Sequence, residues 1–264
     1  LGVSVSRREP GSGTARFSAF PATVRTGRPV IDTGEIGRVS AVWRAGAELG
    51  VQGFITRTVA DNAFLHGHRM ITPRARIGLL VEPLFCDASV DAHHLRAARE
   101  AAQRLQAAGF TVVPISPYPQ ARATFAHFRT TFTSRLAGLN PAAGYAEWIA
   151  QQGRRVSSAE LAAARAHVRR LPDLLAQEWG VDAILTPMLT TDPPRAGHFL
   201  SLPHAENFAA QTRWSPWGSL FNMARLPAIS VPWAVPNHPP VGVHLGGITL
   251  SDAALLGLAR ILHP

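Results

Sequence analysis

Residues 76–115, RIGLLVEPLFCDASVDAHHLRAAREAAQRLQAAGFTVVPI, decide the fold. Two apolar runs, residues 76–81 and 110–115, predict buried strands. Between them, a helix opens at Asp91 and ends at Gly109, and its apolar face comprises Leu95, Ala98, Ala102 and Leu105. A strand, a helix and a strand within about forty residues form a βαβ unit, which predicts a right-handed crossover and parallel pairing.

The rest of the chain extends this pattern in both directions. Thr56 or Thr58 is expected to cap a short helix, and Ser157 with Glu160 forms a capping box. The helix that this box opens is expected to break near Pro172 and to finish at Gly180. Further elements are predicted as a helix with an aromatic stripe over 125–136, strands over 181–187, 228–231 and 241–245, and a helix over 252–262.

These elements predict an α/β fold, a mixed β-sheet flanked by helices. Residues 1–40 mix Gly, Ser and Arg without period and are expected to form an irregular N-terminal segment, whereas residues 41–264 form the α/β domain. The stretch from Thr190 to Trp217 is rich in Pro, Gly and His and predicts a long loop that lines a site.

The composition restricts the available chemistry. The formal net charge is +9, yet the sequence contains no lysine, so all 26 of its Lys and Arg residues are arginines. Arginine does not deprotonate near neutral pH and cannot act as a general base in place of lysine. The single cysteine, Cys86, excludes an intrachain disulfide and a cysteine-based zinc site. We expect no cofactor, no metal and no membrane-spanning segment, and we predict a cytoplasmic protein.

Five segments resemble, in order, motifs from the C-terminal half of the amidase signature family, serine hydrolases that cleave carboxamides. They are residues 53–61, 76–85, 182–187, 221–232 and 239–245. Within the fourth segment, Arg225 stands where the family pattern has glycine, and in the fifth, His244 stands where it has glutamine. The resemblance implies an amidase-like fold, and it implies that the sequence is the C-terminal portion of an amidase, incomplete at its N-terminus.

The same resemblance implies a mechanism with a serine nucleophile, a second serine in a cis peptide that relays a proton, and a lysine base. The family places the lysine and the relay serine upstream of the matched segments. Residues 11–16, GSGTAR, resemble the stretch that holds the nucleophile, so Ser12 and Thr14 are its candidates. Because this chain has no lysine, we expect it to be a truncated or inactive form.

Four further residues are candidates for a substrate pocket, namely Thr186, Trp214, Trp217 and Asn222. For each of them, packing or a turn is an equal alternative. The pairs His66/His68 and His93/His94 invite a metal interpretation, but adjacent histidines on a helix point to different faces. Solvated or capping roles are therefore the better interpretation for these histidines.

Function remains open between two classes. One is an amidase acting on a small-molecule amide, either free-standing or as an ammonia-transferring subunit with partners. The other is a noncatalytic scaffold or an arginine-rich protein that binds nucleic acid or a partner. Nucleic acid is disfavoured because the arginines are scattered and no nucleic-acid-binding motif is present, and a homodimer is left open.

Overall fold

The computed structural model describes Leu49, residues 53–140 and residues 143–263. The helices are α1 (Val59–Leu65), α2 (Ala92–Ala107), α3 (Ala121–Leu136), α4 (Gly144–Arg154), α5 (Ser158–Trp179), the short 3₁₀ helix η1 (Phe199–Ser201), α6 (His204–Trp214), α7 (Ser219–Ala224) and α8 (Asp252–Leu262). The strands are β1 (Arg76–Leu79), β2 (Thr111–Pro114), β3 (Ala183–Pro187), β4 (Ala228–Val235) and β5 (His238–Gly247).

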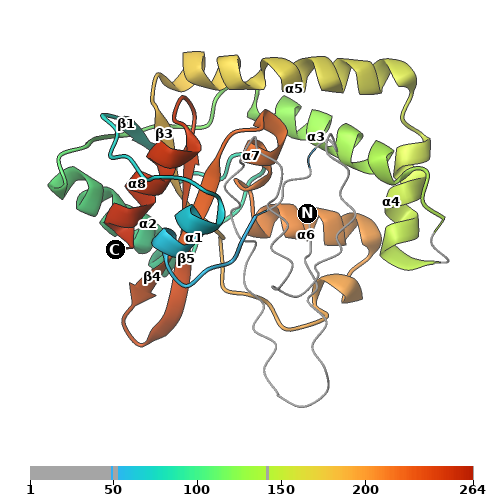
Figure 1. Cartoon of the computed structure of the whole chain (residues 1–264). Coiled ribbons are helices and arrows are strands. Elements are labelled where there is room, and N and C mark those ends of the chain that lie inside the picture. Colours follow the sequence, from blue (N-terminus) through green and yellow to red (C-terminus); the bar gives the residue numbers. More distant parts are fainter. Residues whose placement is uncertain (1–48, 50–52, 141–142, 264) are drawn as a thin grey trace.

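The five strands form one mixed sheet in the order β2-β1-β3-β5-β4. β1 pairs in parallel with β2 and with β3, as the βαβ pattern predicts. β5 runs antiparallel to both β3 and β4, and the turn between β4 and β5 makes them a hairpin. The predicted α/β class, with a mixed sheet flanked by helices, is confirmed (Figure 1).

We call the side of the sheet covered by α2 and α8 the first face. Alternate residues of each strand point to it, for example Ile77 of β1, Leu185 of β3 and Val243 of β5. They pack against small and aliphatic side chains such as Ala101 and Leu255. The tight packing of α8 is possible because Gly257 lies against the chain at Ile71, where a Cβ would meet the Ile71 carbonyl oxygen at 1.9 Å.

The second face is covered by α3, α5, α6 and α7 and has many aromatic side chains. Its buried cluster includes Leu80, which directly follows β1, Ile184 of β3, and Phe128, Phe208 and Phe221 from the helices. Phe221 lies over Gly246 of β5, where a Cβ would come within 1.8 Å of the ring. Because Gly246 has no side chain, the Phe221 ring can pack directly on the backbone of β5.

Short-range signals in the sequence form the expected helix ends. The Thr58 side chain accepts a hydrogen bond from the Asp61 amide at 3.0 Å, which selects Thr58 over Thr56 as the cap of α1. Ser157 and Glu160 make both hydrogen bonds of the capping box that opens α5. Gly180 ends α5 in the left-handed conformation, with φ of 56°.

Two predictions about local structure are wrong. α5 does not break near Pro172 but continues through it, as the long upper helix of Figure 1 shows. A proline inside a helix costs about 3 kcal/mol, and burial of a leucine contributes about 1.5–3 kcal/mol. The fully buried Leu171 and Leu175, which flank Pro172 and pack into the second face, offset that cost.

The stretch from Thr190 to Trp217 is not one long loop. It contains η1 and the 11-residue helix α6, whose buried Asn207, Phe208 and Thr212 face the protein. Its apolar positions are too few to give a helical period, so tertiary packing rather than sequence pattern stabilises α6. The helices α4 and α7 were likewise not predicted.

The predicted segment 1–40, with Ser12 and Thr14, lies outside the described residues. Within the described part of the chain, no helix is both long and apolar enough to cross a membrane.

Candidate functional site

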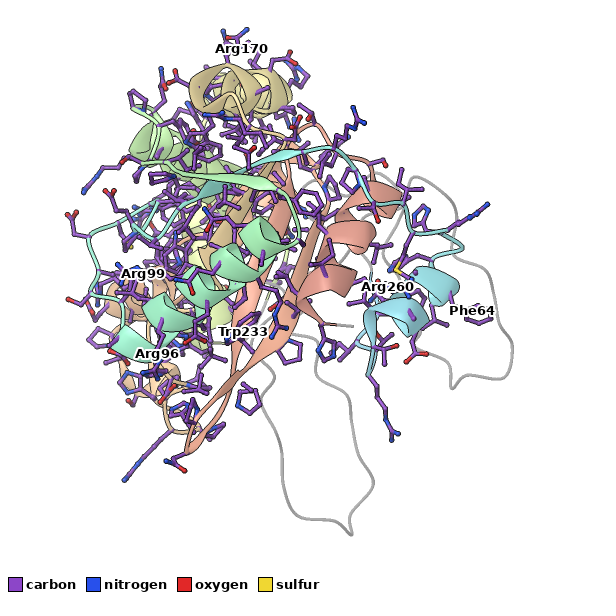
Figure 2. All side chains as sticks on the ribbon, turned by 90° about the vertical axis from the view of Figure 1, so that its left-hand side faces the viewer. Phe64, Arg96, Arg99, Arg170, Trp233 and Arg260 are labelled. Carbon is purple, nitrogen blue, oxygen red and sulfur yellow. The ribbon has the colours of Figure 1, made fainter. Side chains whose placement is uncertain are left out.

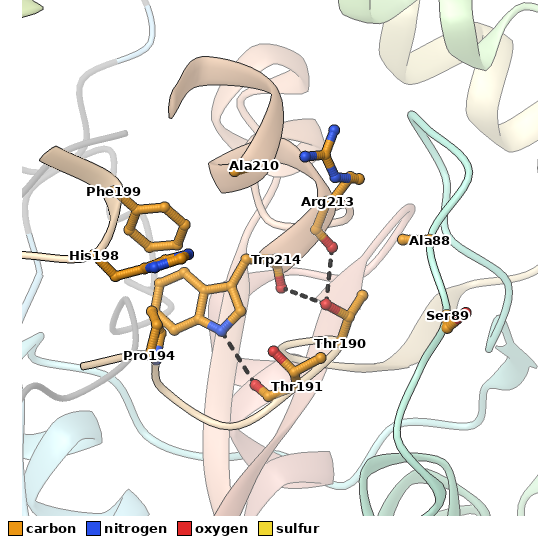
Figure 3. Close-up of a pocket in the computed structure, with 10 residues that line it drawn as sticks. All are labelled: Ala88, Ser89, Thr190, Thr191, Pro194, His198, Phe199, Ala210, Arg213 and Trp214. Atoms are coloured by element: carbon orange, nitrogen blue, oxygen red, sulfur yellow. Dashed lines mark hydrogen bonds between the residues drawn. The ribbon is translucent and has the colours of Figure 1, made fainter. Parts of the chain in front are cut away.

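A pocket of about 320 Å³ opens beside the carboxyl ends of β1 and β3 (Figure 3). The chain leaves β1 toward α2 on the first face, and it leaves β3 toward α6 on the second. Ligand sites of open α/β sheets lie where successive connections diverge in this way. Ala88 and Ser89 line one side of the pocket, and Thr190, Thr191 and residues of α6 line the other.

The buried Thr190 ties the segment after β3 to the end of α6. Its hydroxyl donates hydrogen bonds to the carbonyl oxygens of Arg213 at 2.8 Å and Trp214 at 3.3 Å. Its backbone amide donates to the Trp214 carbonyl at 3.0 Å. These bonds satisfy carbonyl groups that the end of a helix leaves unpaired, and they hold the pocket wall at a fixed distance from the sheet.

Aromatic rings form one wall of the pocket. The Trp214 indole donates to the Thr191 carbonyl at 3.1 Å, which fixes its orientation. Phe199 of η1 packs on Trp214 with ring centroids 5.5 Å apart, and His198 packs on Phe199 at 5.4 Å (Figure 3). This wall offers a flat apolar surface with one polar edge.

Arg213 is the charged residue among those lining the pocket, and its guanidinium is paired with Glu206. The pocket therefore has no strong net charge. Polar contacts are available from the hydroxyl groups of Ser89 and Thr191. A few fixed polar groups against an apolar wall suit an uncharged ligand with an apolar part.

A second groove, of about 770 Å³, lies on the other side of α6, toward α3 and α4. Aromatic side chains such as Phe125 and Trp148 line it. It also contains the partly buried Cys86, whose pKa is raised because burial disfavours the thiolate. Its charged lining residues are four arginines, Arg122, Arg129, Arg155 and Arg213, and the acidic Asp87 and Glu160.

The four candidate pocket residues lie in different surroundings. Trp214 lines the pocket of Figure 3. Trp217 is 1% exposed and donates its indole hydrogen to the Glu82 carbonyl at 2.9 Å. Thr186 is buried in β3 and donates to the Pro187 carbonyl at 2.7 Å, and Asn222 donates to the Leu49 carbonyl at 3.0 Å. The last three are not among the residues that line the pocket in Figure 3.

His244 is a buried titratable group beside Thr186. Its Nδ1 lies 3.5 Å from the Thr186 hydroxyl, and the edge of its ring meets Phe221 at a centroid distance of 5.1 Å. Complete burial lowers the pKa of His244 to about 4, so the ring is neutral at pH 7.

Sequence reasoning missed a group of side chains that could hold a metal ion. His93, His94 and Asp192 offer ligand atoms that all lie within 4.8 Å of one another. Burial would raise the pKa of Asp192, but hydrogen bonds with His93 and His238 hold it below its ordinary value. The argument that adjacent histidines diverge fails here because both sit in the first turn of α2 and reach Asp192 from two sides.

Comparison with known proteins gives a family match over part of the chain and a shared fold. Residues 145–256 match the family model described as Amidase. No curated protein matches the chain at a significant level.

Solved structures share the fold at low sequence identity. A 6-aminohexanoate cyclic dimer hydrolase, solved with its substrate, is 21% identical with a TM-score of 0.67, over 92% of this chain and 58% of that one. A bacterial aryl acylamidase of the amidase signature family is 15% identical with a TM-score of 0.54, over 78% of this chain and 53% of that one. A glutamyl-tRNA(Gln) amidotransferase component from Thermotoga maritima is 21% identical with a TM-score of 0.57, over 78% of this chain and 50% of that one. The chain thus spans less than two thirds of the length of these enzymes.

Proposed function

Residues 145–256 belong to the amidase family, and from that premise we propose that the chain forms the substrate-holding part of a carboxamide hydrolase. The observation that carries the proposal is the pocket at the carboxyl ends of β1 and β3, with its aromatic wall and its balanced charge. We propose Trp214 as a substrate-binding residue. An aromatic or otherwise apolar carboxamide fits this wall, and the hydroxyl groups of Ser89 and Thr191 can bond its polar end.

We propose further that the reaction follows the serine, cis-serine and lysine mechanism that the resemblance implies. In such a mechanism the lysine accepts the proton that the nucleophilic serine loses on attacking the carbonyl carbon. The 264 residues contain no lysine. The base must therefore come from outside this sequence, whether from another segment or another chain. Loss of a proton acceptor lowers the rate by about 10²–10⁴.

Two measurements on the full chain test these steps separately. In the first, simple amides and anilides are incubated with the chain, and release of ammonia or aniline is compared with a buffer blank. We expect no turnover above the blank. Turnover near 1 s⁻¹, which is within the ordinary range for enzymes, or stoichiometric labelling of a hydroxyl by a fluorophosphonate, would contradict the absence of a base.

The second measurement is binding, which does not need the base. Benzamide titrated into the chain is expected to bind in the pocket, as measured by calorimetry, and Trp214→Ala is expected to weaken binding at least tenfold. Trp179→Ala is the matched control, because the Trp179 indole bonds to the Ser116 carbonyl and does not line the pocket. Equal affinity of the two variants for benzamide would show that Trp214 does not bind it, and would contradict the assignment of this pocket as the substrate site.

The second groove favours a different candidate, a noncatalytic protein that binds an anionic partner. Four arginines line it, and Arg122 is paired with Asp87 at 2.6 Å. Other arginines, such as Arg170 on the outer side of α5 in Figure 2, are spread over the surface. A gel shift with random-sequence nucleic acid at about 50 mM salt separates the two functions. Retardation that disappears as the salt concentration rises would favour the nucleic-acid binder, and no retardation would leave the hydrolase.

A further inference from the structure

Three imidazole rings surround one carboxylate near the carboxyl end of β3 and the first residue of β5. His93 and His94 come from α2, Asp192 from the segment after β3, and His238 from the first residue of β5. The Nε2 atoms of His93 and His94 lie 2.9 Å and 3.4 Å from Asp192 Oδ1, and that of His238 lies 2.9 Å from Oδ2. The His93 ring lies 4.5 Å, between centroids, from each of the other two rings.

The spacing of the ligand atoms suits a small divalent ion. A tetrahedral zinc ion with bonds of about 2.0–2.1 Å holds its ligand atoms about 3.3 Å apart. The donor atoms of His93, His94 and Asp192 lie within 4.8 Å of one another. Small side-chain movements therefore bring all three atoms to bonding distance, and the backbone does not have to move.

His94 gives an independent observation in favour of a ligand at this position. The residue is 2% exposed, and neither ring nitrogen has a hydrogen-bond partner among the described residues. A buried polar atom without a partner costs about 1–3 kcal/mol. The Nε2 atom of this ring lies 3.4 Å from Asp192 Oδ1, a close contact without the geometry of a hydrogen bond. A metal ion between the two atoms would satisfy both of them.

His238 holds the Asp192 carboxylate in place from the other side. Its Nδ1 lies 2.7 Å from the Pro239 carbonyl, which can only accept, so Nδ1 carries the hydrogen. Nε2 lies 2.9 Å from Asp192 Oδ2, which can also only accept, so the ring donates from both nitrogens and carries a positive charge itself. This ion pair holds the carboxylate with Oδ1 near His93 and His94.

We propose that His93, His94 and Asp192 bind a divalent transition-metal ion such as Zn²⁺, and that His238 is a positioning residue for the Asp192 carboxylate. Imidazole and carboxylate ligands suit Zn²⁺ and neighbouring first-row metals. The carboxylate of Asp192 is 47% exposed, so the ion can enter from solvent. Three protein ligands leave one position for water or for a small ligand.

The ion would join three parts of the fold that are far apart in the sequence. It would link the start of α2 and the tip of the β4–β5 hairpin to the segment that continues from the pocket wall. Asp192 follows Thr191, which lines the pocket and accepts the hydrogen bond of Trp214. Binding of the ion would therefore fix the position of that wall. The metal site does not depend on the proposed amide chemistry.

Calorimetric titration of Zn²⁺ into the metal-free full chain, carrying no polyhistidine tag, tests the proposal. We expect one ion to bind per chain, and Co²⁺ in its place to give the absorption bands of a site with fewer than six ligands. Asp192→Asn and His93→Gln should each lower the affinity at least a hundredfold. His238→Gln should lower it by about 10–100-fold, the usual effect of losing a positioning residue.

His127→Gln is the matched control, because the His127 and His167 rings are also 4.5 Å apart but do not belong to the three-residue group. It should bind Zn²⁺ as the unchanged chain does. Circular dichroism of each metal-free variant shows whether it folds, and the partly exposed His93 tolerates change better than the buried His94. No 1:1 binding, or equal binding by the Asp192→Asn and His127→Gln variants, would overturn the site and leave a hydrogen-bonded histidine cluster.

Discussion

The two faces of the sheet are built from different kinds of side chain. The first face is almost entirely aliphatic and is covered by the regular helices α2 and α8. The second face contains the aromatic side chains of Tyr118, Phe128, Phe208 and Trp217 and is covered by α3, α5, α6 and α7. Both described grooves are lined by α6, which lies on the second face. The difference indicates that the first face serves stability, and that the second also shapes the cavities.

The largest expected effect comes from two glycines, one on each face. In Gly257→Ala on the first face, the new Cβ would lie 1.9 Å from the Ile71 carbonyl oxygen, which belongs to the backbone. In Gly246→Ala on the second face, it would lie 1.8 Å from the Phe221 ring, which is a side chain. Overpacking usually costs about 1–3 kcal/mol, occasionally more. We expect about 4 kcal/mol for Gly257→Ala and about 3 kcal/mol for Gly246→Ala, since a ring moves more easily than a backbone.

Denaturant unfolding of both variants measures these costs. Gly138→Ala is the control, because no atom lies within 4 Å of its new Cβ, and it should change the free energy of unfolding by less than about 0.5 kcal/mol. A larger loss of stability in Gly246→Ala than in Gly257→Ala would contradict this prediction. It would mean that the Phe221 ring adjusts to a new methyl group less easily than the backbone at Ile71 does.

The second effect is a pH dependence that belongs to the second face. Burial lowers the pKa of His244 to about 4 in the folded state, against about 6.5 in the unfolded state. Between these two values the unfolded chain binds more protons, so stability is complete above pH 6.5 and falls as the pH drops toward 4. The shift corresponds to about 3 kcal/mol.

His244→Gln introduces the residue of the family pattern and removes the titrating group. Its free energy of unfolding, measured from pH 7 to pH 4, should fall less than that of the unchanged chain, by about 3 kcal/mol at the acid end. Because all other histidines remain in both proteins, the difference isolates His244. Parallel curves for the two proteins would show that His244 is solvated.

The third effect compares one tryptophan on each face. Trp217→Phe on the second face removes the donor of the part-buried Glu82 carbonyl and leaves a space in place of a side chain that is 1% exposed, so we expect a cost of about 2 kcal/mol. Trp233→Phe on the first face, labelled in Figure 2, loses a hydrogen bond to the solvent-accessible Glu100 carboxylate and weakens the contact with Arg104. We expect about 1 kcal/mol there, because water can replace the lost partner.

Thermal and denaturant unfolding at low and high salt measure both tryptophan variants. The cost of Trp233→Phe should decrease at high salt, since its partners are charged, whereas that of Trp217→Phe should not. A salt-dependent cost for Trp217→Phe would contradict its burial in an uncharged environment.

The success of prediction from the sequence depends on how local the signal is, and not on the face of the sheet. The βαβ unit and the caps at Thr58 and Ser157 are local patterns, and all were predicted. The helix α6 and the continuity of α5 through Pro172 depend on packing between distant segments, so they were not. For the candidate site, Trp214 was named from the sequence. The contact of Asp192 with His93 and His238 was not predictable, because the sheet brings together residues 99 and 46 positions apart.

The smallest effect concerns a residue on the second face that departs from the family pattern. Arg225 ends α7 with φ of 55°, in the left-handed region, at the position where the resembling family has glycine. A side chain with a Cβ costs about 1–2 kcal/mol in this conformation, and glycine adopts it without that cost. This backbone conformation explains why the family pattern has glycine at the position of Arg225. We expect Arg225→Gly to raise the free energy of unfolding by about 1 kcal/mol.

Arg225→Ala separates the backbone effect from the contacts of the guanidinium group. Alanine keeps the Cβ and loses those contacts, so the difference between the glycine and alanine variants measures the conformational strain alone. That difference, from urea unfolding, should favour glycine by about 1 kcal/mol. Equal stability of the two variants would mean that the turn after α7 relaxes at no cost, and the second face would then be more adaptable at its edge than at Gly246.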